Sequence, residues 1–196
     1  IAEDADLAAA VRYGVQDVMI NSGQTCTALT RMLLPASRYA EAVDIALAET
    51  RSLVMGDPLD PQSFLGPMCS AAQRRSVLDY IRIGQEEGAR LLCGGDTPAA
   101  FERGYYVSPT LFADVDNRMR IAQEEIFGPV LCLIPYADEA QAVQLANDSP
   151  FGLSSAVWAG SAERALQLGR QLRAGQCFLN GAAFNYQAPF GGYKQS

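Results

Sequence analysis

The sequence of 196 residues contains no histidine. Without an imidazole, the chain by itself has no Ser-His-Asp triad, no Cys-His dyad and no imidazole metal ligand. Hydrolases of those classes are therefore excluded unless a partner supplies the base. A cysteine nucleophile in this chain would depend on backbone donors, a carboxylate or the positive charge of a cofactor for its activation.

Paired cysteines are also missing, because the five cysteines are scattered and form no Cys-x-x-Cys motif. An odd number without paired spacing supports neither a structural zinc site nor a thioredoxin-like motif, so we predict no metal site. Cys132 and Cys177 lie in apolar runs and are interpreted as core residues. Cys69 and Cys93 have no neighbouring residues that indicate chemistry. Cys26 is the exception treated below.

Positively charged residues are few: the sequence has 15 Lys and Arg residues against 22 Asp and Glu residues, which gives a formal net charge of −7. Such a chain is not attracted to phosphate backbones or anionic lipid headgroups, so we expect neither nucleic acid nor membrane as a partner. No apolar run approaches the roughly 18 residues of a membrane-spanning helix. Nothing at the start is typical of a signal peptide. We therefore expect a cytoplasmic protein.

The hydrophobic content of 49% and charged content of 19% are typical of a globular domain. A continuous apolar run over 130–135 is typical of a strand buried on both faces. Strands that alternate with helices imply right-handed crossovers, which predicts an α/β fold with an open, mostly parallel sheet and flanking helices. No linker interrupts the pattern, so we predict one domain over residues 1–196. The predicted helices span about 6–20, 37–50 (capped by Ser37), 70–87, 137–147 and 161–173, and the predicted strands about 30–34, 89–93, 130–135, 153–158 and 176–179.

The stretch from Asn21 to Ala28 places Cys26 on a turn between a predicted helix and a predicted strand. Gly23 tolerates the unusual backbone angles of such a turn, and the turn lets backbone N–H groups face a substrate. A cysteine held in this way is a candidate nucleophile, because a thiolate attacks carbonyl carbon well. The alternative is that Cys26 is a small core hydrophobe, as single cysteines often are.

Four segments follow one another in an order and at a spacing that match a known family. They are Gly23-Gln24-x-Cys26-x-Ala28-x-x-Arg31, Glu124-Glu125-Ile126-Phe127-Gly128-Pro129-Val130, Asn147-x-x-x-Phe151-Gly152-Leu153-Ser154 and Pro189-Phe190-Gly191-Gly192-x-Lys194-x-Ser196. Together they span nearly the whole chain and resemble the active-site cysteine motif and later landmarks of the aldehyde dehydrogenase superfamily. The resemblance implies the fold of that family's catalytic domain.

The resemblance also implies roles for individual residues. Cys26 matches the catalytic cysteine, while Glu125 and Phe127 match a pair that binds NAD or NADP. A carboxylate suits the ribose hydroxyls of the nicotinamide end, and an apolar ring helps to hold the planar base. The alternative for Glu125 is a solvated acidic turn. For the lysine of the last landmark, Lys194, we expect an exposed, solvated side chain.

Three further residues lie where the family has substrate contacts, with ordinary loop packing as the alternative. They are Ile20, before the cysteine turn, and Phe184 and Tyr186, in the loop before the last landmark. The resemblance implies a small-molecule aldehyde as substrate and a homo-oligomer for the full-length enzyme.

Several parts of the family pattern are missing from the chain. These are the Gly-rich dinucleotide-binding half, the upstream Glu that serves as base, an upstream Asn that stabilises the oxyanion, and an oligomerisation tail. We therefore expect a fragment of a longer polypeptide that is inactive when isolated. Three functions stay open: oxidation of an aldehyde to a carboxylic acid in the full-length enzyme, a CoA-acylating aldehyde dehydrogenase, and a folded module without turnover.

Overall fold

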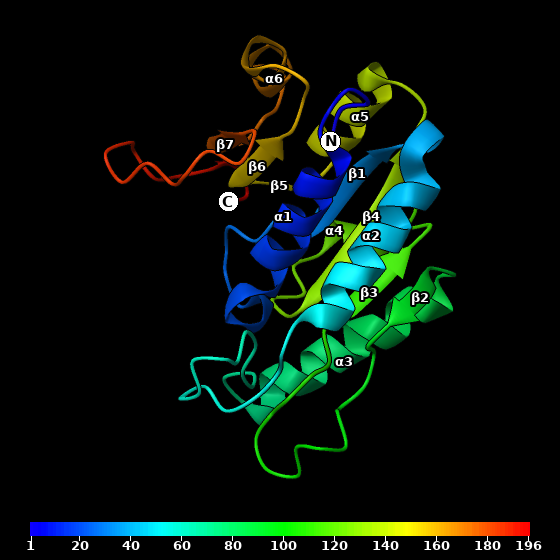
Figure 1. Ribbon diagram of the computed structural model, residues 1–196, viewed down its shortest axis with the longest axis vertical. Helices are drawn as coiled ribbons and strands as arrows, with labels where there is room; N and C mark the ends of the chain where they lie inside the picture. The colour runs from blue at the N-terminus through cyan, green and yellow to red at the C-terminus, as the bar shows by residue number, and fades with distance from the viewer.

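The computed structural model describes residues 1–196 and shows helices on both faces of a central sheet (Figure 1). The α-helices are α1 (Leu7–Met19), α2 (Tyr39–Ser52), α3 (Ala71–Glu86), α4 (Arg120–Gln123), α5 (Glu139–Asn147) and α6 (Ala162–Gly169). The strands are β1 (Arg31–Pro35), β2 (Arg90–Cys93), β3 (Thr110–Ala113), β4 (Val130–Tyr136), β5 (Phe151–Gly152), β6 (Ser154–Val157), β7 (Gln176–Leu179) and β8 (Tyr193–Lys194). Two 3₁₀ turns, η1 (Ile20–Gly23) and η2 (Ala36–Arg38), flank β1. None of the helices is both long and apolar enough to cross a membrane.

The central sheet has the strand order β1-β4-β3-β2. Strands β1 and β3 run parallel to β4, whereas β2 pairs with β3 in the antiparallel direction. Sheets of this kind carry helices on both faces, because parallel neighbours are joined by crossovers. The prediction of an open, mostly parallel sheet with flanking helices is confirmed for this part of the chain.

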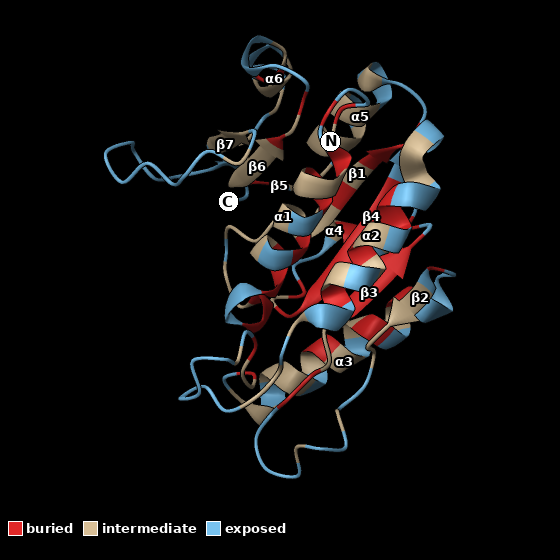
Figure 2. Ribbon diagram, viewed as in Figure 1, coloured by how far each residue is buried: buried red, intermediate tan, exposed pale blue.

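Strand β4 is the centre of the core, as its apolar run predicted. Leu131 and Leu133 point to the face covered by α1 and α2, and Cys132 and Ile134 point to the face covered by α3. All four side chains are almost fully buried (Figure 2). Burying an aliphatic side chain of this size stabilises a fold by roughly 1.5–3 kcal/mol. The two faces of β4 therefore hold the layers together.

Four helices begin at a residue whose side chain caps the first turn. Asp6, Ser70, Asp138 and Ser161 each accept a hydrogen bond from a backbone N–H three residues later. Such caps contribute about 1 kcal/mol each and explain why these starts were predictable. The predicted cap at Ser37 was wrong, because Ser37 lies in η2 and its hydroxyl donates to Glu3.

The residues from 151 onwards form a smaller part of the molecule, here called the C-terminal unit. Its strands β6 and β7 pair with each other in parallel and form a sheet of their own. The strands predicted near 153–158 and 176–179 are thus present, and the structure places them in a second sheet beside the central one. The free edge of β6 faces the free edge of β1 across a cavity, and neither edge is close enough to pair.

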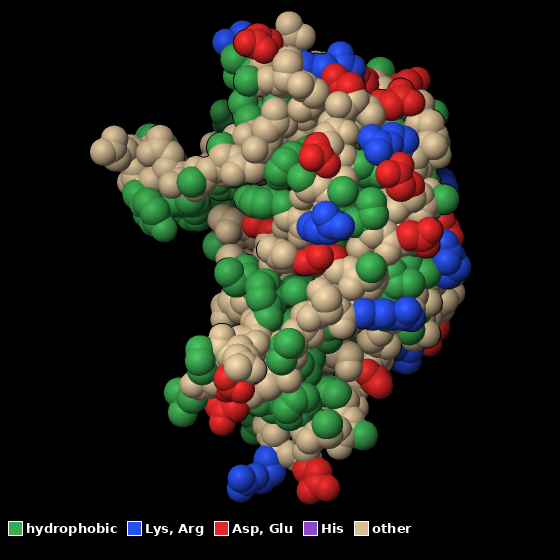
Figure 3. All heavy atoms as spheres, in the orientation of Figure 1, with side chains coloured by type: hydrophobic (Ala, Val, Ile, Leu, Met, Phe, Trp, Pro, Cys, Tyr) green, Lys and Arg blue, Asp and Glu red, His purple; other side chains and the backbone are tan.

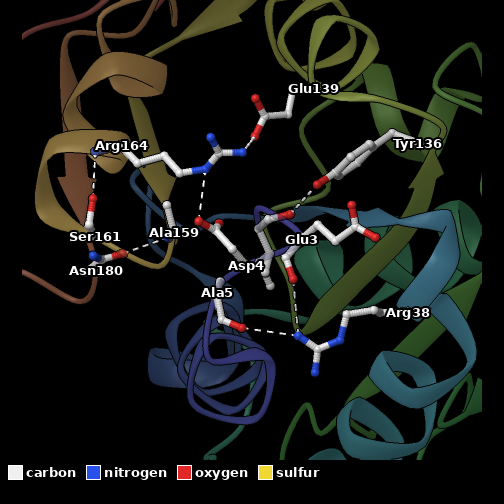
Figure 4. A network of polar contacts seen from close by, with 11 residues as sticks. Glu3, Asp4, Ala5, Arg38, Tyr136, Glu139, Ala159, Ser161, Arg164 and Asn180 are labelled. Carbon is white, nitrogen blue, oxygen red and sulfur yellow. Dashed lines mark hydrogen bonds and ion pairs between the residues drawn. The ribbon is translucent and has the colours of Figure 1, made fainter.

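Side-chain contacts attach the C-terminal unit to the start of the chain (Figure 4). Arg164 of α6 forms an ion pair with Asp4 at 3.0 Å and a second one with Glu139 of α5. Beside these charges, Ala165 packs on Ala2. After β7 the chain continues as an arm, residues 180–192, which projects from the body and carries hydrophobic side chains (Figure 3).

Candidate active site

The turn before Cys26 has an unusual backbone. Asn21, Ser22 and Gly23 have successive φ angles of 53°, 54° and 72°. Two residues other than glycine in the left-handed region are strained and need support from their surroundings. The Ser22 hydroxyl donates to the carbonyl of Gly66 at 2.8 Å, and the Asn21 amide donates to the carbonyl of Gln24 at 2.9 Å. The surrounding structure therefore holds the cysteine turn in place.

Gly23 brings this turn into contact with a distant segment. A Cβ atom on Gly23 would lie 2.0 Å from the carbonyl oxygen of Gly128, a distance that no side chain allows. The glycine is thus required twice, by its positive φ and by this close approach of two backbones. The contact sets Cys26 beside the segment that carries Glu125 and Phe127.

That second segment is held by a residue that the sequence did not point to. Phe127 has a φ of 55°, and the side-chain amide of Gln73 on α3 donates to the carbonyls of Ile126 at 3.2 Å and Phe127 at 2.9 Å. A glutamine on the polar side of a predicted helix carries no local signal for such a role. Gln73 therefore positions the Phe127 turn from another element.

Cys26 itself is exposed, and its backbone N–H donates to no other group of the chain. That N–H remains available to a bound ligand. Beyond the cysteine, the N–H of Leu29 donates to the Asp17 carboxylate at 3.1 Å. Burial raises the pKa of Asp17, with the Leu29 hydrogen bond opposing the shift. Asp17 on α1 therefore anchors the chain as it leaves the cysteine turn.

Arg31 is the last residue of the cysteine motif, and its side chain makes several hydrogen bonds. Its guanidinium donates to the Asn117 side chain at 2.7 Å and to the carbonyls of Leu145 at 2.9 Å and Ala146 at 3.1 Å. Burial lowers the pKa of Arg31. A cation at the end of a helix satisfies free carbonyls and complements the helix dipole, so Arg31 ties β1 to the end of α5.

A cavity of about 520 Å³ brings three of the predicted site residues together. Cys26, Glu125 and Phe127 all line it, and most of the remaining lining residues are hydrophobic. The predicted substrate-contact residues Ile20, Phe184 and Tyr186 are not part of its lining. Ile20 is 55% exposed on η1, whereas the other two lie on the projecting arm, where Phe184 contacts Tyr186.

Two adjacent carboxylates in this region differ in what they contact. Glu124 pairs with Arg120 at 2.7 Å and accepts from the hydroxyl of Tyr80 at 2.8 Å. Glu125 lines the cavity, and no side chain of the protein pairs with it. An unpaired carboxylate can accept from a ribose diol, and the half-buried Phe127 ring offers an apolar surface next to it. These residues fit the nicotinamide end of a dinucleotide.

Lys194 is exposed, and its side chain also contacts the backbone of a neighbouring segment. Its ammonium group donates to the carbonyls of Asn147 at 2.7 Å and Ser149 at 3.0 Å. Burial lowers the pKa of Lys194, and the neighbouring Arg173 adds to the effect. Lys194 is therefore exposed, as expected, and its ammonium group also ties the last landmark to the end of α5.

The sequence model of the aldehyde dehydrogenase family matches residues 1–196. Among curated proteins, 3-succinoylsemialdehyde-pyridine dehydrogenase of a Pseudomonas species is 50% identical over 197 residues, covering 100% of this chain and 41% of that protein. Geranial dehydrogenase of Castellaniella defragrans is 46% identical and likewise covered over 41% of its length. The chain thus spans about 41% of the length of each of these two curated relatives.

Solved structures show the same relationship. Aldehyde dehydrogenase of Mycobacterium tuberculosis, complexed with NAD⁺, superposes with a TM-score of 0.96 at 47% identity, over 98% of this chain and 40% of that one. A Cys-to-Ala mutant of aldehyde dehydrogenase C from Pseudomonas syringae, complexed with NAD⁺ and octanal, gives 0.96 at 45% identity over the same shares. On these matches and on the geometry of its cysteine turn, the chain belongs to the aldehyde dehydrogenase family.

Proposed function

We propose that this chain, as the catalytic domain of a longer polypeptide, carries out NAD(P)-dependent oxidation of an aldehyde to a carboxylic acid with Cys26 as nucleophile. The observation that carries the proposal is the shared cavity. It combines an exposed thiol with a free backbone N–H, an unpaired carboxylate at Glu125 and an aromatic surface at Phe127. Residues 1–196 would form the domain that supplies these groups.

The chemistry begins with the thiolate of Cys26. It attacks the carbonyl carbon, a C–S bond forms, and the carbonyl oxygen becomes an oxyanion that the Cys26 N–H can stabilise. The nicotinamide end of NAD(P), which Glu125 and Phe127 would hold, would supply the hydride acceptor that takes this carbon to the oxidation level of a thioester. Water then attacks the thioester carbon and releases one of its protons to solvent. The C–S bond breaks, the carboxylic acid leaves, and the thiolate is restored.

The roles of Glu125 and Phe127 are to bind and orient. The Glu125 carboxylate would accept hydrogen bonds from ribose hydroxyls, and the Phe127 ring would limit movement of the planar base. Fixing the reacting groups close to each other is worth several kcal/mol of barrier in such reactions. The hydrogen bonds from Gln73 to the Phe127 turn support this arrangement.

Relatives supply support for an aldehyde substrate. One is named for a semialdehyde, one for geranial, and one structure contains octanal. The largely apolar lining of the cavity is compatible with an aldehyde that has a hydrocarbon body. Ile20, Phe184 and Tyr186 stay proposed substrate contacts of the longer protein, which we also propose to be a homo-oligomer.

Peptide-resolved alkylation of the five cysteines tests the nucleophile and the cofactor site in one experiment. The chain is treated with iodoacetamide with and without NAD⁺, and the rate at each cysteine is read by mass spectrometry. We expect Cys26 to react at least about tenfold faster than Cys69, which is also exposed and serves as the internal control. NAD⁺ should slow the reaction at Cys26 only, and a Glu125→Gln variant should weaken this protection.

Equal rates at Cys26 and Cys69 would contradict activation of the thiol within this chain and would favour the module without turnover. A second measurement uses the longer polypeptide. Reduction of NAD⁺ with octanal should be lost in a Cys26→Ala variant and retained in a Cys69→Ala variant. Activity that survives Cys26→Ala would overturn the proposal, and activity that requires CoA would favour the acylating alternative.

A further inference from the structure

The end of helix α5 accepts hydrogen bonds from residues that lie far away in the sequence. A helix leaves its last carbonyl groups without partners inside the helix. Here the five successive carbonyls of residues 145–149 each accept from a side chain of another element. The donors are Arg31 of β1, Asn117 and Gln123 from the segment before β4, and Lys194 of β8. Residues 145–149 are here called the α5 end.

Asn117 is the buried centre of these contacts. Its side-chain oxygen accepts from Arg31 at 2.7 Å, and its side-chain nitrogen donates to the carbonyl and the carboxylate of Asp148 at 2.9 and 3.0 Å. Buried polar groups need hydrogen-bond partners, and each polar atom of this side chain has one. Because Arg31 is the last residue of the cysteine motif, Asn117 joins that motif to the α5 end.

Gln123 reaches the same place from the segment that carries Glu125. Its side-chain nitrogen donates to the carbonyl of Asn117 at 2.6 Å and to the carbonyl of Asp148 at 2.9 Å. Gln123 is the last residue of α4, lines the cavity and precedes Glu125 by two positions. Helix α4 is a single turn of 4 residues, and a helix of this length is not stable by itself. Its end therefore needs support from other elements, which these two hydrogen bonds supply.

The segment after α4 makes no hydrogen bonds between backbone groups. Residues 125–127 neither donate to nor accept from another backbone group. Such a segment moves easily unless side chains hold it. Besides the buried side chain of Ile126, the support consists of Gln73, which donates to the carbonyls of Ile126 and Phe127, and of Gln123 at the other end. Glu125 thus lies between two glutamines that bind to different helices.

The other polar contacts of α4 are of a different kind. The Tyr80 hydroxyl donates to Glu124, and Glu124 pairs with Arg120 of the same helix. These side chains are exposed, and exposed ion pairs contribute little to stability. The hydrogen bond from Gln123 to Asn117 is partly buried and connects α4 to the interior of the molecule.

Two contacts therefore set the position of the Glu125 carboxylate relative to the thiol of the cysteine turn. The first is the approach of Gly23 to Gly128. The second is the α5 end, to which both Arg31 and Gln123 donate. One contact alone would leave the segment free to pivot, whereas two fix its orientation. Orientation matters here, because a displacement of about 1 Å can slow a reaction between bound groups about a hundredfold.

We infer that Gln123 is a positioning residue of the cofactor site, which fixes Glu125 in the cavity by attaching the end of α4 to the α5 end. The inference rests on the proposed function, because it takes the ribose hydroxyls of NAD(P) as the ligand of Glu125. Gln123 itself contacts no reacting atom in this scheme. Loss of its two hydrogen bonds should weaken cofactor binding and leave the thiol of Cys26 as reactive as before.

The test compares the longer polypeptide with three variants of it. Gln123→Met keeps the length of the side chain and removes the donor, whereas Gln123→Lys keeps a group that can donate to carbonyls. Gln144→Met is the matched control, because Gln144 lies exposed on α5 and its side chain makes no hydrogen bond. For each form we measure the Kd for NAD⁺, the KM for NAD⁺ with octanal as substrate, and the alkylation rate of Cys26 without cofactor.

We expect Gln123→Met to raise the Kd and KM for NAD⁺ about five- to tenfold, and Gln123→Lys and Gln144→Met to stay within about twofold of the unmodified protein. The alkylation rate of Cys26 should change by less than about twofold in every form, which distinguishes positioning from a general loosening of the fold.

Unchanged constants for NAD⁺ in Gln123→Met would overturn the inference while the proposed function stands. An equal loss in Gln123→Lys, or a parallel loss of alkylation at Cys26, would assign the effect to packing and would also overturn it. If the unmodified polypeptide binds no NAD⁺, the proposed function fails, and the inference fails with it.

Discussion

The central sheet and the C-terminal unit are built from the same elements, strands and helices in alternation, yet they differ in how much they bury. The central sheet lies between two clusters of 15 and 13 buried residues, one on each face. The C-terminal unit contributes to a cluster of only 4 buried residues, one of which is Ala2 from the start of the chain. Figure 2 shows this contrast as buried strands in the centre and half-buried strands beside α6.

The C-terminal unit depends on its neighbours for stability. A sheet of two strands is marginally stable by itself and needs a third strand or more packing. Here the extra contacts come from Ala2, from the ion pairs of Arg164 and from the backbone bond of Ala2 to Trp158. The C-terminal unit should therefore unfold locally before the central sheet does, and four experiments test this difference in stability.

The largest effect is expected from truncating the core. Phe112 on β3 is fully buried among residues of α3 and α4, so Phe112→Ala should lower the free energy of unfolding by roughly 3–5 kcal/mol in a urea titration. The matched change in the C-terminal unit is Leu166→Ala on α6, where the side chain is 43% exposed. It should shift stability by no more than about 0.5 kcal/mol. Equal losses would show that the two regions do not differ as described.

A smaller but site-directed effect is expected at the cysteine turn. Gly23→Ala adds a methyl group at a φ of 72° against the backbone of Gly128, and should cost more than about 2 kcal/mol of stability while changing the alkylation rate of Cys26. The control is Gly88→Ala, at a φ of 97° with open space around the new atom. It should cost about 1 kcal/mol and leave Cys26 unaffected. An unchanged alkylation rate of Cys26 in Gly23→Ala would show that the contact between Gly23 and Gly128 does not support the cysteine turn.

The stability of the contact between the start of the chain and the two sheets should depend on pH. The Ile1 amine has a folded pKa of about 6 against a reference of 8.0, so between these values the unfolded chain holds more protons than the folded one. Stability should therefore rise from pH 6 to pH 8, by about 2–3 kcal/mol at most. No histidine titrates in this range. Acetylation of the amine is the control and should flatten the profile, and a slope that survives acetylation would assign the effect to another group.

The smallest effect is expected from the ion pairs of Arg164. Arg164→Met removes the contacts to Asp4 and Glu139, but these side chains are partly exposed, so the loss should stay below about 1 kcal/mol. Exchange of the amides in β6 and β7 should become faster, and those in β4 should not change. The control is Arg82→Met, which removes ion pairs within α3 only. Faster exchange in both variants would mean that the ion pairs do not fasten the C-terminal unit.

Much of the central fold was predictable, because its signals are local. A cap at Asp6 or Ser70, an apolar face in α1 and a continuous apolar run in β4 each depend on neighbouring residues in the sequence. The pairing of β6 and β7 with each other was missed. Both strands were recognised, but their burial is intermediate, and nothing within them specifies which edge they join.

The candidate site was predictable in part. Cys26, Glu125 and Phe127 were identified from their motifs, and the structure brings them to one cavity. The residues that hold them there were not identified. Gln73 lies on a helix more than fifty positions before Phe127. Its hydrogen bond to the Phe127 carbonyl cannot be predicted from the residues next to either one.

The amino-acid sequence alone is enough to say which reactive groups the chain has. It contains a thiol on a glycine turn, it lacks every imidazole, and it has the order of helices and strands of an α/β domain. The contact between Gly23 and Gly128, which brings the Cys26 thiol and the Glu125 carboxylate to one cavity, is visible only in the folded molecule. The same is true of the unpaired edges of β1 and β6. The physical reason is that element formation depends on local hydrogen bonds and periodicity, whereas contacts between distant segments depend on how whole elements pack.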